Sequence, residues 1–282
     1  MPPRSTSIYD EPKVDCHCHV FDPARFPYGA DTFYRPAGQE IGTASQLAHV
    51  MDAYGIRYGL LVGPNSGYEL DNGCMLDAIA HADGRLKGIA VVANDIARDA
   101  LASLRAAGVI GVAFNATHHG VDHYLRAGRL LEHLAALGMC VSVQVHQDQL
   151  VALAPTLAQS GLPVMIDHCG RPPPEAGLEQ PGFRALLALA GNGRTYVKLS
   201  GYSKISREGH PYADVRPYIE ALIDAFTPDR CLWASDWPFL RAPSRVDCGP
   251  LLQLVAQLLP DAADRRKVLW ETPRRLLGFE TP

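Results

Sequence analysis

The chain alternates between short apolar segments rich in β-branched residues and longer stretches with helical periodicity. The apolar segments have the length and the flanking turn residues of buried strands, and apolar positions at i, i+3 and i+4 follow them as in amphipathic helices. The predicted strands span residues 14–21, 58–62, 86–93, 109–114, 140–145, 163–167, 195–199 and 231–235. The predicted helices span residues 44–54, 71–82, 99–107, 123–137, 150–159, 183–190 and 215–226, with closing helices after residue 250. Thr43 is the expected N-cap of the first helix.

Eight strands that alternate with eight helices are the count of a (β/α)8 TIM barrel of the α/β class. An open, doubly wound sheet would normally carry a glycine-rich phosphate loop after its first strand, and neither G-x-G-x-x-G nor G-x-x-x-x-G-K occurs in the chain. No low-complexity linker or break in composition divides the sequence. We therefore predict a single barrel domain over residues 1–282.

The first predicted strand carries two histidines and two cysteines in alternation. His17 and His19 are expected to project to one face of the strand, and Cys16 and Cys18 to the other. Neutral imidazole is a common ligand of zinc, iron and copper and a common acid or base near neutral pH. For this pair alone, a buried pair held by ordinary hydrogen bonds is the alternative.

Polar residues with metal-binding or acid–base capacity also follow three later strands. His146 ends the fifth predicted strand, His168 the sixth and Asp236 the eighth. In a barrel, the C-terminal ends of the strands form one rim, and the active site lies there. We therefore expect these side chains to converge with the histidines of the first strand. The long loop at residues 22–42, rich in proline, glycine and aromatic residues, is expected to contribute to the same site.

Composition excludes several classes of function. The chain has 282 residues, a formal net charge of -4 and no cluster of lysine and arginine, which argues against binding to nucleic acid. Its apolar runs are broken before the ~18 residues that a membrane span requires, and no signal peptide is visible. Seven cysteines, an odd number that falls partly in apolar strands, favour reduced thiols in a cytoplasmic protein. A homo-oligomer is left open, since barrels of this kind often self-associate.

Three motifs carry a resemblance to a known family. They are H-x-H after the first strand, residues 166–172 (IDHCGRP) after the sixth and residues 234–238 (ASDWP) after the eighth. In this order they resemble the amidohydrolase superfamily, and most of all its branch of 2-pyrone-4,6-dicarboxylate lactonases and related sugar-lactone hydrolases. The resemblance implies a hydrolase in which Asp236 is the general base that activates water. His17, His19 and His168 would polarise the carbonyl group, directly or through a metal.

Departures from the family pattern bear on the metal. Binuclear members usually carry a bridging lysine or glutamate on the fourth strand, and residues 112–115 (VAFN) offer neither. The dicarboxylate lactonases work without a divalent metal and have a residue other than histidine near the end of the fifth strand, where this chain has His146, with Gln144 two residues earlier on the same face. We therefore expect one divalent metal, zinc, with a metal-free site as the alternative. The expected ligands are His17, His19, His146, His168 and Asp236.

The resemblance also implies how the substrate binds. Arg171 matches a position that binds a substrate carboxylate in the lactonases, but an arginine of their fourth strand is replaced here by Ala113. Fewer guanidinium groups favour a small anionic or polyhydroxylated lactone over the pyrone dicarboxylate itself. The candidate substrate-binding residues are Arg171, Tyr34, Asn115, His119, Lys204 and Arg241.

Two other classes of function stay open from the sequence. A zinc-dependent decarboxylase of an aromatic or dienoic acid would use the same residues, because similar mononuclear barrels include such enzymes. A non-catalytic ligand-binding barrel is the third hypothesis, against which a buried base at Asp236 argues, since binding alone has no need of one.

Overall fold

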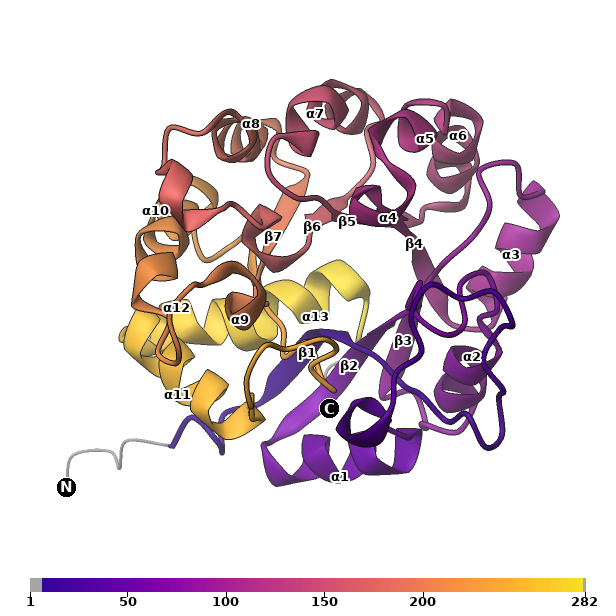
Figure 1. Ribbon diagram of the computed structural model, residues 1–282, viewed down its shortest axis with the longest axis horizontal. Coiled ribbons are helices and arrows are strands. Elements are labelled where there is room, and N and C mark those ends of the chain that lie inside the picture. The colour runs from indigo at the N-terminus through magenta and orange to yellow at the C-terminus, as the bar shows by residue number, and fades with distance from the viewer. Residues whose placement is uncertain (1–6, 281–282) are drawn as a thin grey trace.

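Eight parallel strands follow one another around the sheet in the order of the chain (Figure 1). The computed structural model describes residues 7–280. Each strand pairs with the next one along the sequence, as expected for repeated βα units. The strands are β1 (Lys13–Cys18), β2 (Ile56–Val62), β3 (Leu86–Ala90), β4 (Val109–Asn115), β5 (Cys140–Gln144), β6 (Val164–Ile166), β7 (Thr195–Leu199) and β8 (Cys231–Trp233).

Backbone hydrogen bonds join the last strand to the first. The amide of Asp236 donates to the carbonyl of His17 at 2.8 Å, and the amide of His19 donates to the carbonyl of Trp237 at 2.8 Å. These bonds lie just past the C-terminal ends of β1 and β8, and they bring the sheet almost to closure as a barrel. The predicted (β/α)8 TIM barrel is confirmed.

Helices form a ring outside the strands (Figure 1). The prediction of Thr43 as an N-cap is confirmed, because its side chain and that of Gln46 form a capping box. The prediction of a single helix over residues 123–137 is wrong. One helix ends at Leu125 and another begins at Gly128, a residue of poor helix propensity. The α-helices are α1 (Ala44–Ala53), α2 (Gly73–Ala80), α3 (Arg98–Ala106), α4 (Ala116–His119), α5 (Val121–Leu125), α6 (Gly128–Leu137), α7 (Gln149–Gln159), α8 (Pro181–Leu189), α9 (Tyr202–Ile205), α10 (Arg216–Phe226), α11 (Cys248–Leu258), α12 (Ala262–Arg266) and α13 (Thr272–Leu277).

The first strand departs from simple alternation. Its register against β2 shifts between Asp15 and Cys18, as at a β-bulge. Cys16 belongs to the apolar cluster inside the barrel, whereas Cys18 belongs to the cluster between the strands and the outer helices. The expectation that the two cysteines share a face is therefore wrong, because the bulge rotates the end of the strand.

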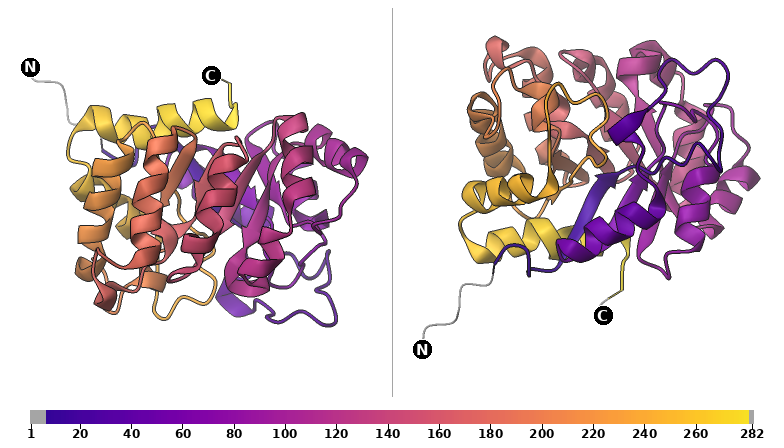
Figure 2. Two further views of the ribbon diagram at one scale, coloured as in Figure 1. Left: turned by 90° about the horizontal axis from the view of Figure 1, so that it is seen from above. Right: turned by 60° about the horizontal axis from the view of Figure 1, so that its bottom comes forward.

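The interior of the barrel is closed at one end only. Tyr58 at the N-terminal end of β2 stacks on Trp270 and Phe279 of the C-terminal segment, at 5.8 and 4.5 Å between ring centroids. This segment runs across the N-terminal ends of the strands (Figure 2). The opposite end is left for the loops that follow the strands. Within residues 7–280, no helix is long and apolar enough to span a membrane.

Candidate functional site

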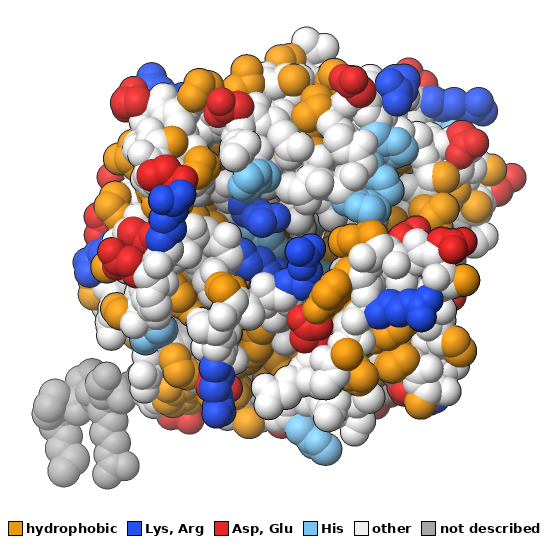
Figure 3. Space-filling view, viewed as in Figure 1, with side chains coloured by type: hydrophobic (Ala, Val, Ile, Leu, Met, Phe, Trp, Pro, Cys, Tyr) orange, Lys and Arg blue, Asp and Glu red, His pale blue; other side chains and the backbone are white. Residues whose placement is uncertain are grey.

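A cavity of about 590 Å³ opens at the C-terminal ends of the strands. In the space-filling view, lysine and arginine side chains lie beside the central hollow and histidines lie on its rim (Figure 3). The cavity is lined from almost every βα loop. Among its lining residues are all five predicted metal ligands (His17, His19, His146, His168 and Asp236) and four predicted substrate-binding residues (Arg171, Asn115, Lys204 and Arg241).

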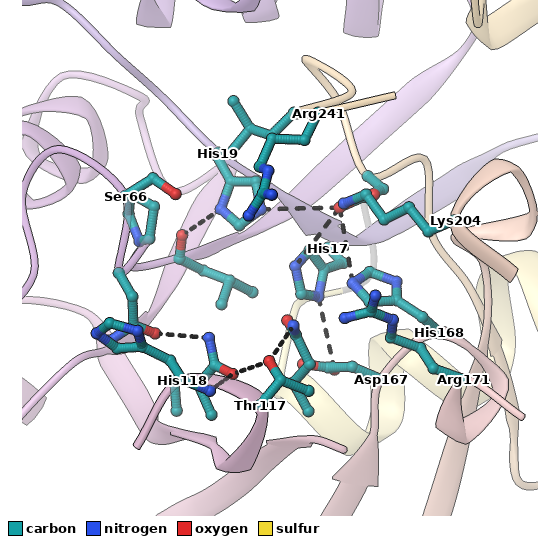
Figure 4. A pocket seen from close by; sticks show the side chains of 18 of the residues that line it. His17, His19, Ser66, Thr117, His118, Asp167, His168, Arg171, Lys204 and Arg241 are labelled. Atoms are coloured by element: carbon teal, nitrogen blue, oxygen red, sulfur yellow. Dashed lines mark hydrogen bonds and ion pairs between the residues drawn. The ribbon is translucent and has the colours of Figure 1, made fainter. Parts of the chain in front are cut away.

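The imidazoles of His17, His19 and His168 lie close together in this cavity (Figure 4). They surround one oxygen of Asp236. The Nε2 atoms of His17, His19 and His168 lie 3.9, 3.7 and 3.7 Å from Asp236 Oδ1. All four residues are buried, and no described residue forms a hydrogen bond with Asp236 Oδ1. Three imidazole nitrogens therefore converge on a carboxylate oxygen that accepts no hydrogen bond from the described residues.

Backbone strain accompanies this arrangement. His168 and Asp236 have φ values of 51° and 63°, in the left-handed region that non-glycine residues rarely adopt. Such residues cost roughly 1–3 kcal/mol each and persist where the surroundings impose them. Here the amide of Arg171 donates to the carbonyl of His168 at 2.9 Å, and the amide of Asp236 takes part in barrel closure. The turns aim both side chains into the cavity.

The absence of a side chain at Gly201 leaves room for the side chain of His168. A Cβ atom at Gly201, which has a φ of 67°, would lie 2.7 to 2.9 Å from atoms of the His168 side chain. The imidazole Nδ1 of His168 contacts the hydroxyl of Ser200 at 3.0 Å. The loop after β7 thus fixes the orientation of this histidine.

A buried polar network lies beneath His17. Lys198 Nζ is 2.8 Å from Asp167 Oδ1, 2.8 Å from the Ser142 hydroxyl and 3.2 Å from His17 Nδ1. Burial alone would raise the pKa of Asp167, but Lys198 and His17 hold it well below its usual range. Lys198 is thus an internal ion-pair partner of Asp167.

A second buried carboxylate ties β1 to β8. Asp15 accepts hydrogen bonds from the amide and hydroxyl of Ser235 and from the amide of His17. Burial raises the pKa of Asp15 to about 6, with the hydrogen bonds from Ser235 acting in the opposite direction. Because it holds the residue before Asp236 and the backbone of His17, Asp15 sets the spacing between these two site residues.

The donor set fits a divalent metal. The tightest group comprises His17, His168 and Asp236, whose ligand atoms all lie within 4.8 Å of one another among the residues that the structure describes. Burial lowers the pKa of His17 to about 4 and lowers that of His168 well below its usual range, so both imidazoles are neutral, as ligands must be. The Nε2 atoms of His17 and His168 lie 3.9 and 3.7 Å from Asp236 Oδ1, so these three residues would hold such an ion.

The other two predicted ligands, His19 and His146, are not members of this group of three. The Nδ1–H of His19 donates to the carbonyl oxygen of Val62 at 2.7 Å, which directs its Nε2 toward Asp236. His146 lines the cavity from the end of β5, and burial followed by the nearby charge of Arg171 lowers its pKa. It is not a member of the group of three and is placed by the structure as a lining residue of the cavity.

Lysine and arginine side chains form a cationic side of the cavity. Lys204 makes an ion pair with Asp236 Oδ2. Burial would raise the pKa of Asp236, but Lys204 and His168 hold it well below its usual range, so the carboxylate is ionised. Arg171 has a buried Nε without a hydrogen-bond partner among the described residues, and burial lowers its pKa, with Arg241 adding to the effect.

Two predicted substrate-binding residues do not line the cavity. The Tyr34 ring lies under the guanidinium of Arg241, at 5.3 Å, and its hydroxyl bonds Glu40. His119 faces Asn65, whose side-chain nitrogen is 3.2 Å from its Nε2. Both therefore support lining residues from behind.

Sequence reasoning missed several lining residues. His118, next to His119, lines the cavity and stacks on Phe33 of the long first loop at 4.2 Å between ring centroids. The helical turn α4 decides which of the two adjacent histidines faces inward, and no periodicity could be read in so short an element. The other missed polar residues are Asn65, Ser66, Thr117, Ser203 and Ser206.

Comparison with known proteins gives a consistent result. Residues 14–279 match the sequence profile of the family described as amidohydrolase. A 4-sulfomuconolactone hydrolase from Rhizobium radiobacter is 37% identical over 271 residues, which cover 94% of this chain and 89% of that protein. A 2-pyrone-4,6-dicarboxylate hydrolase from Comamonas testosteroni is 29% identical over 277 residues, which cover 93% of this chain and 89% of that protein.

A solved structure matches the fold closely. It is a candidate 2-pyrone-4,6-dicarboxylic acid hydrolase from Acinetobacter baumannii with citric acid bound. Its TM-score is 0.84 at 25% sequence identity, and the match covers 95% of this chain and 99% of that one.

Proposed function

The chain belongs to the amidohydrolase family, and from this premise we propose that it is a hydrolase that opens the ring of an anionic lactone. The observation that carries the proposal is the convergence of His17, His19 and His168 on the ionised carboxylate of Asp236 at the floor of the cavity. A buried carboxylate beside three imidazoles is suited to taking a proton from water. The relatives named above, both hydrolases of cyclic esters, support the same chemistry.

In the proposed mechanism, Asp236 acts as the general base. It accepts a proton from water while the water oxygen attacks the carbonyl carbon of the lactone. The bond from this carbon to the ring oxygen then breaks. The protonated Asp236 returns its proton to the leaving oxygen, which gives a hydroxy acid and restores the carboxylate.

We propose zinc as the bound metal, held by His17, His168 and Asp236, with His19 beside them. Such a metal supplies Lewis acidity toward the carbonyl oxygen and lowers the pKa of water. The neutral state of the two buried imidazoles supports this assignment, because the metal-free alternative requires protonated histidines to polarise the carbonyl.

We propose that Arg171 and Arg241 bind an acidic group of the substrate. Neither guanidinium has an ion-pair or hydrogen-bond partner among the described side chains, apart from the aromatic contact of Arg241 with Tyr34. An anion would satisfy the buried Nε of Arg171 and relieve the repulsion between the two groups. The names of the two relatives describe lactones with sulfonate or carboxylate groups, which is consistent with an anionic substrate.

We place the enzyme in a reducing compartment such as the cytoplasm. All seven cysteines are free and buried. Thiols of this kind are typical of proteins that never meet an oxidising environment.

The test is hydrolysis of a panel of carboxylated lactones, followed as ring opening, together with metal content of the protein purified without added metal. We expect about one zinc per chain and a loss of ring opening of about 100-fold or more in Asp236→Asn. Release of carbon dioxide from an aromatic or dienoic acid, without ring opening of any lactone, would contradict the proposal and favour the decarboxylase. Ligand binding without turnover would favour the binding barrel.

A further inference from the structure

A chain of hydrogen-bonding side chains runs along the side of the cavity that carries α4. Asn115 and Gln144 are paired in the register of β4 and β5, and Thr117 follows on α4. In Figure 4, Ser66 and His118 mark one side of the cavity, while Lys204 and Arg171 mark the other. No charged residue is a member of this hydrogen-bonded chain.

One backbone amide fixes the direction of the whole chain. The N–H of His118 donates to Asn115 Oδ1 at 3.2 Å, so this atom must be the carbonyl oxygen of the side chain. The hydroxyl of Thr117 lies 2.5 Å from the same oxygen and therefore donates its single proton to it. The remaining nitrogen of Asn115 donates to Asn65 Oδ1 at 2.9 Å, in agreement with this direction.

The orientation of Gln144 follows from this order. Its side-chain amide lies 3.0 Å from the Thr117 hydroxyl, whose proton is already engaged. The hydroxyl can only accept from Gln144, so the amide nitrogen faces Thr117. The other end, Gln144 Oε1, has no donor among the described residues, and Gln144 lines the cavity.

We propose that Gln144 determines which substituent the substrate carries at this end of the cavity. Its Oε1 accepts a hydrogen bond from a hydroxyl group and disfavours a second carboxylate, which has no proton to donate and meets an oxygen of partial negative charge. The inference rests on the proposed function, because it describes the substrate of the same cavity. Together with Arg171 and Arg241, Gln144 selects a lactone that is acidic at one end and hydroxylated at the other.

The test uses two unreactive ring compounds, so that binding is measured apart from hydrolysis. The probes are 4-hydroxycyclohexanecarboxylic acid and cyclohexane-1,4-dicarboxylic acid, with dissociation constants from calorimetry. We expect the wild-type protein to prefer the hydroxy acid by about 10-fold, the upper range for one net hydrogen bond. Gln144→Met removes the acceptor at similar size and should abolish the preference.

Thr117→Val provides a second variant of different kind. It leaves Gln144 in place but removes the group that orients its amide, so the preference should fall several-fold while affinity for the dicarboxylate rises. The matched control is Gln159→Met, the same substitution at an exposed position near the end of α7, which should keep the wild-type preference.

Equal binding of the two probes by the wild type, no binding of the hydroxy acid, or a preference that survives in both variants would overturn the inference. Lactone hydrolysis is assayed in parallel. A retained preference without ring opening would refute the proposed function alone, and ring opening without a preference would refute the inference alone.

Discussion

Substitution of Lys198 by methionine tests the buried network under the site. The change removes the ammonium group, which lies 2.8 Å from Asp167, and keeps most of the apolar stem. Both side chains are almost fully buried, at 0% and 4% exposure. Breaking a buried ion pair on one side costs ~3–5 kcal/mol, because the remaining charge is left without compensation. Ser142 still donates to Asp167 at 2.8 Å, so we expect a loss near the lower end, about 3 kcal/mol.

The assay is the free energy of unfolding from urea denaturation at pH 7. Asp167→Asn should also destabilise, since it leaves the lysine unpaired. The double variant Lys198→Met with Asp167→Asn leaves no buried charge, and its loss should be smaller than the sum of the two single losses by about 1–3 kcal/mol. A loss below about 1 kcal/mol in the single variant, or strict additivity in the double variant, would refute the reasoning.

The same pair predicts a dependence on pH. The folded pKa of Asp167 is below its unfolded value of ~3.9, so the pair contributes stability above that value, and this contribution is lost as the pH falls through the folded pKa. The difference in stability between wild type and Lys198→Met should therefore be full at pH 6–7 and should narrow below about pH 4. A difference that stays constant to pH 3 would contradict the assigned charges.

Three further outcomes follow from the site. Gly201→Ala places a Cβ against the His168 ring at a φ of 67°, so ring opening should fall by at least about 10-fold, with a stability loss of roughly 1–3 kcal/mol in urea denaturation; wild-type turnover would contradict the contact. Lys204→Met removes the cation that most lowers the pKa of Asp236, so the acid limb of the pH–rate profile should move to higher pH, and an unmoved limb would show that Lys204 does not act on the base. Zinc at about 100 times its dissociation constant should stabilise the metal-free protein by about 2.7 kcal/mol, read as a rise in Tm, and His168→Ala should reduce this gain sharply.

The sequence was sufficient to predict the site residues whose positions follow from strand topology. His17 lies near the end of β1, and His168 and Asp236 follow β6 and β8. Parallel strands in a barrel bring their C-terminal ends to one rim whatever the loops do. Lys198 alternates with Val197 and Leu199 along β7, and this pattern predicts an internal ion pair for its ammonium group. Its partner Asp167 could not be identified, because pairing across the barrel depends on register that no single strand reveals.

Which loop residues line the cavity could not be predicted in this way. Tyr34 and His119 were expected in the cavity, and each instead packs behind a lining residue. Within a short helical turn or a long irregular loop, a shift of one position rotates a side chain out of the site, and hydrophobic pattern does not fix that rotation. His118 in place of His119 is such a shift. The bulge in β1, which places Cys16 and Cys18 on different faces, was not predicted either, because the hydrophobic pattern does not show a shift in strand register.

The same backbone hydrogen bonds close the barrel and hold site residues together. The backbone bonds that join β1 to the segment after β8 involve His17, His19 and Asp236 themselves, and Asp15 holds the same seam through Ser235. The left-handed backbone of Asp236 costs free energy, which barrel closure helps to offset, because the amide of Asp236 in this turn donates to the carbonyl of His17. A chain that fails to close its sheet therefore loses the positions of Asp236 and two imidazoles together. Variants that weaken the seam should lose metal binding in proportion to stability, whereas variants such as Lys204→Met, which lie on the cavity side, should not.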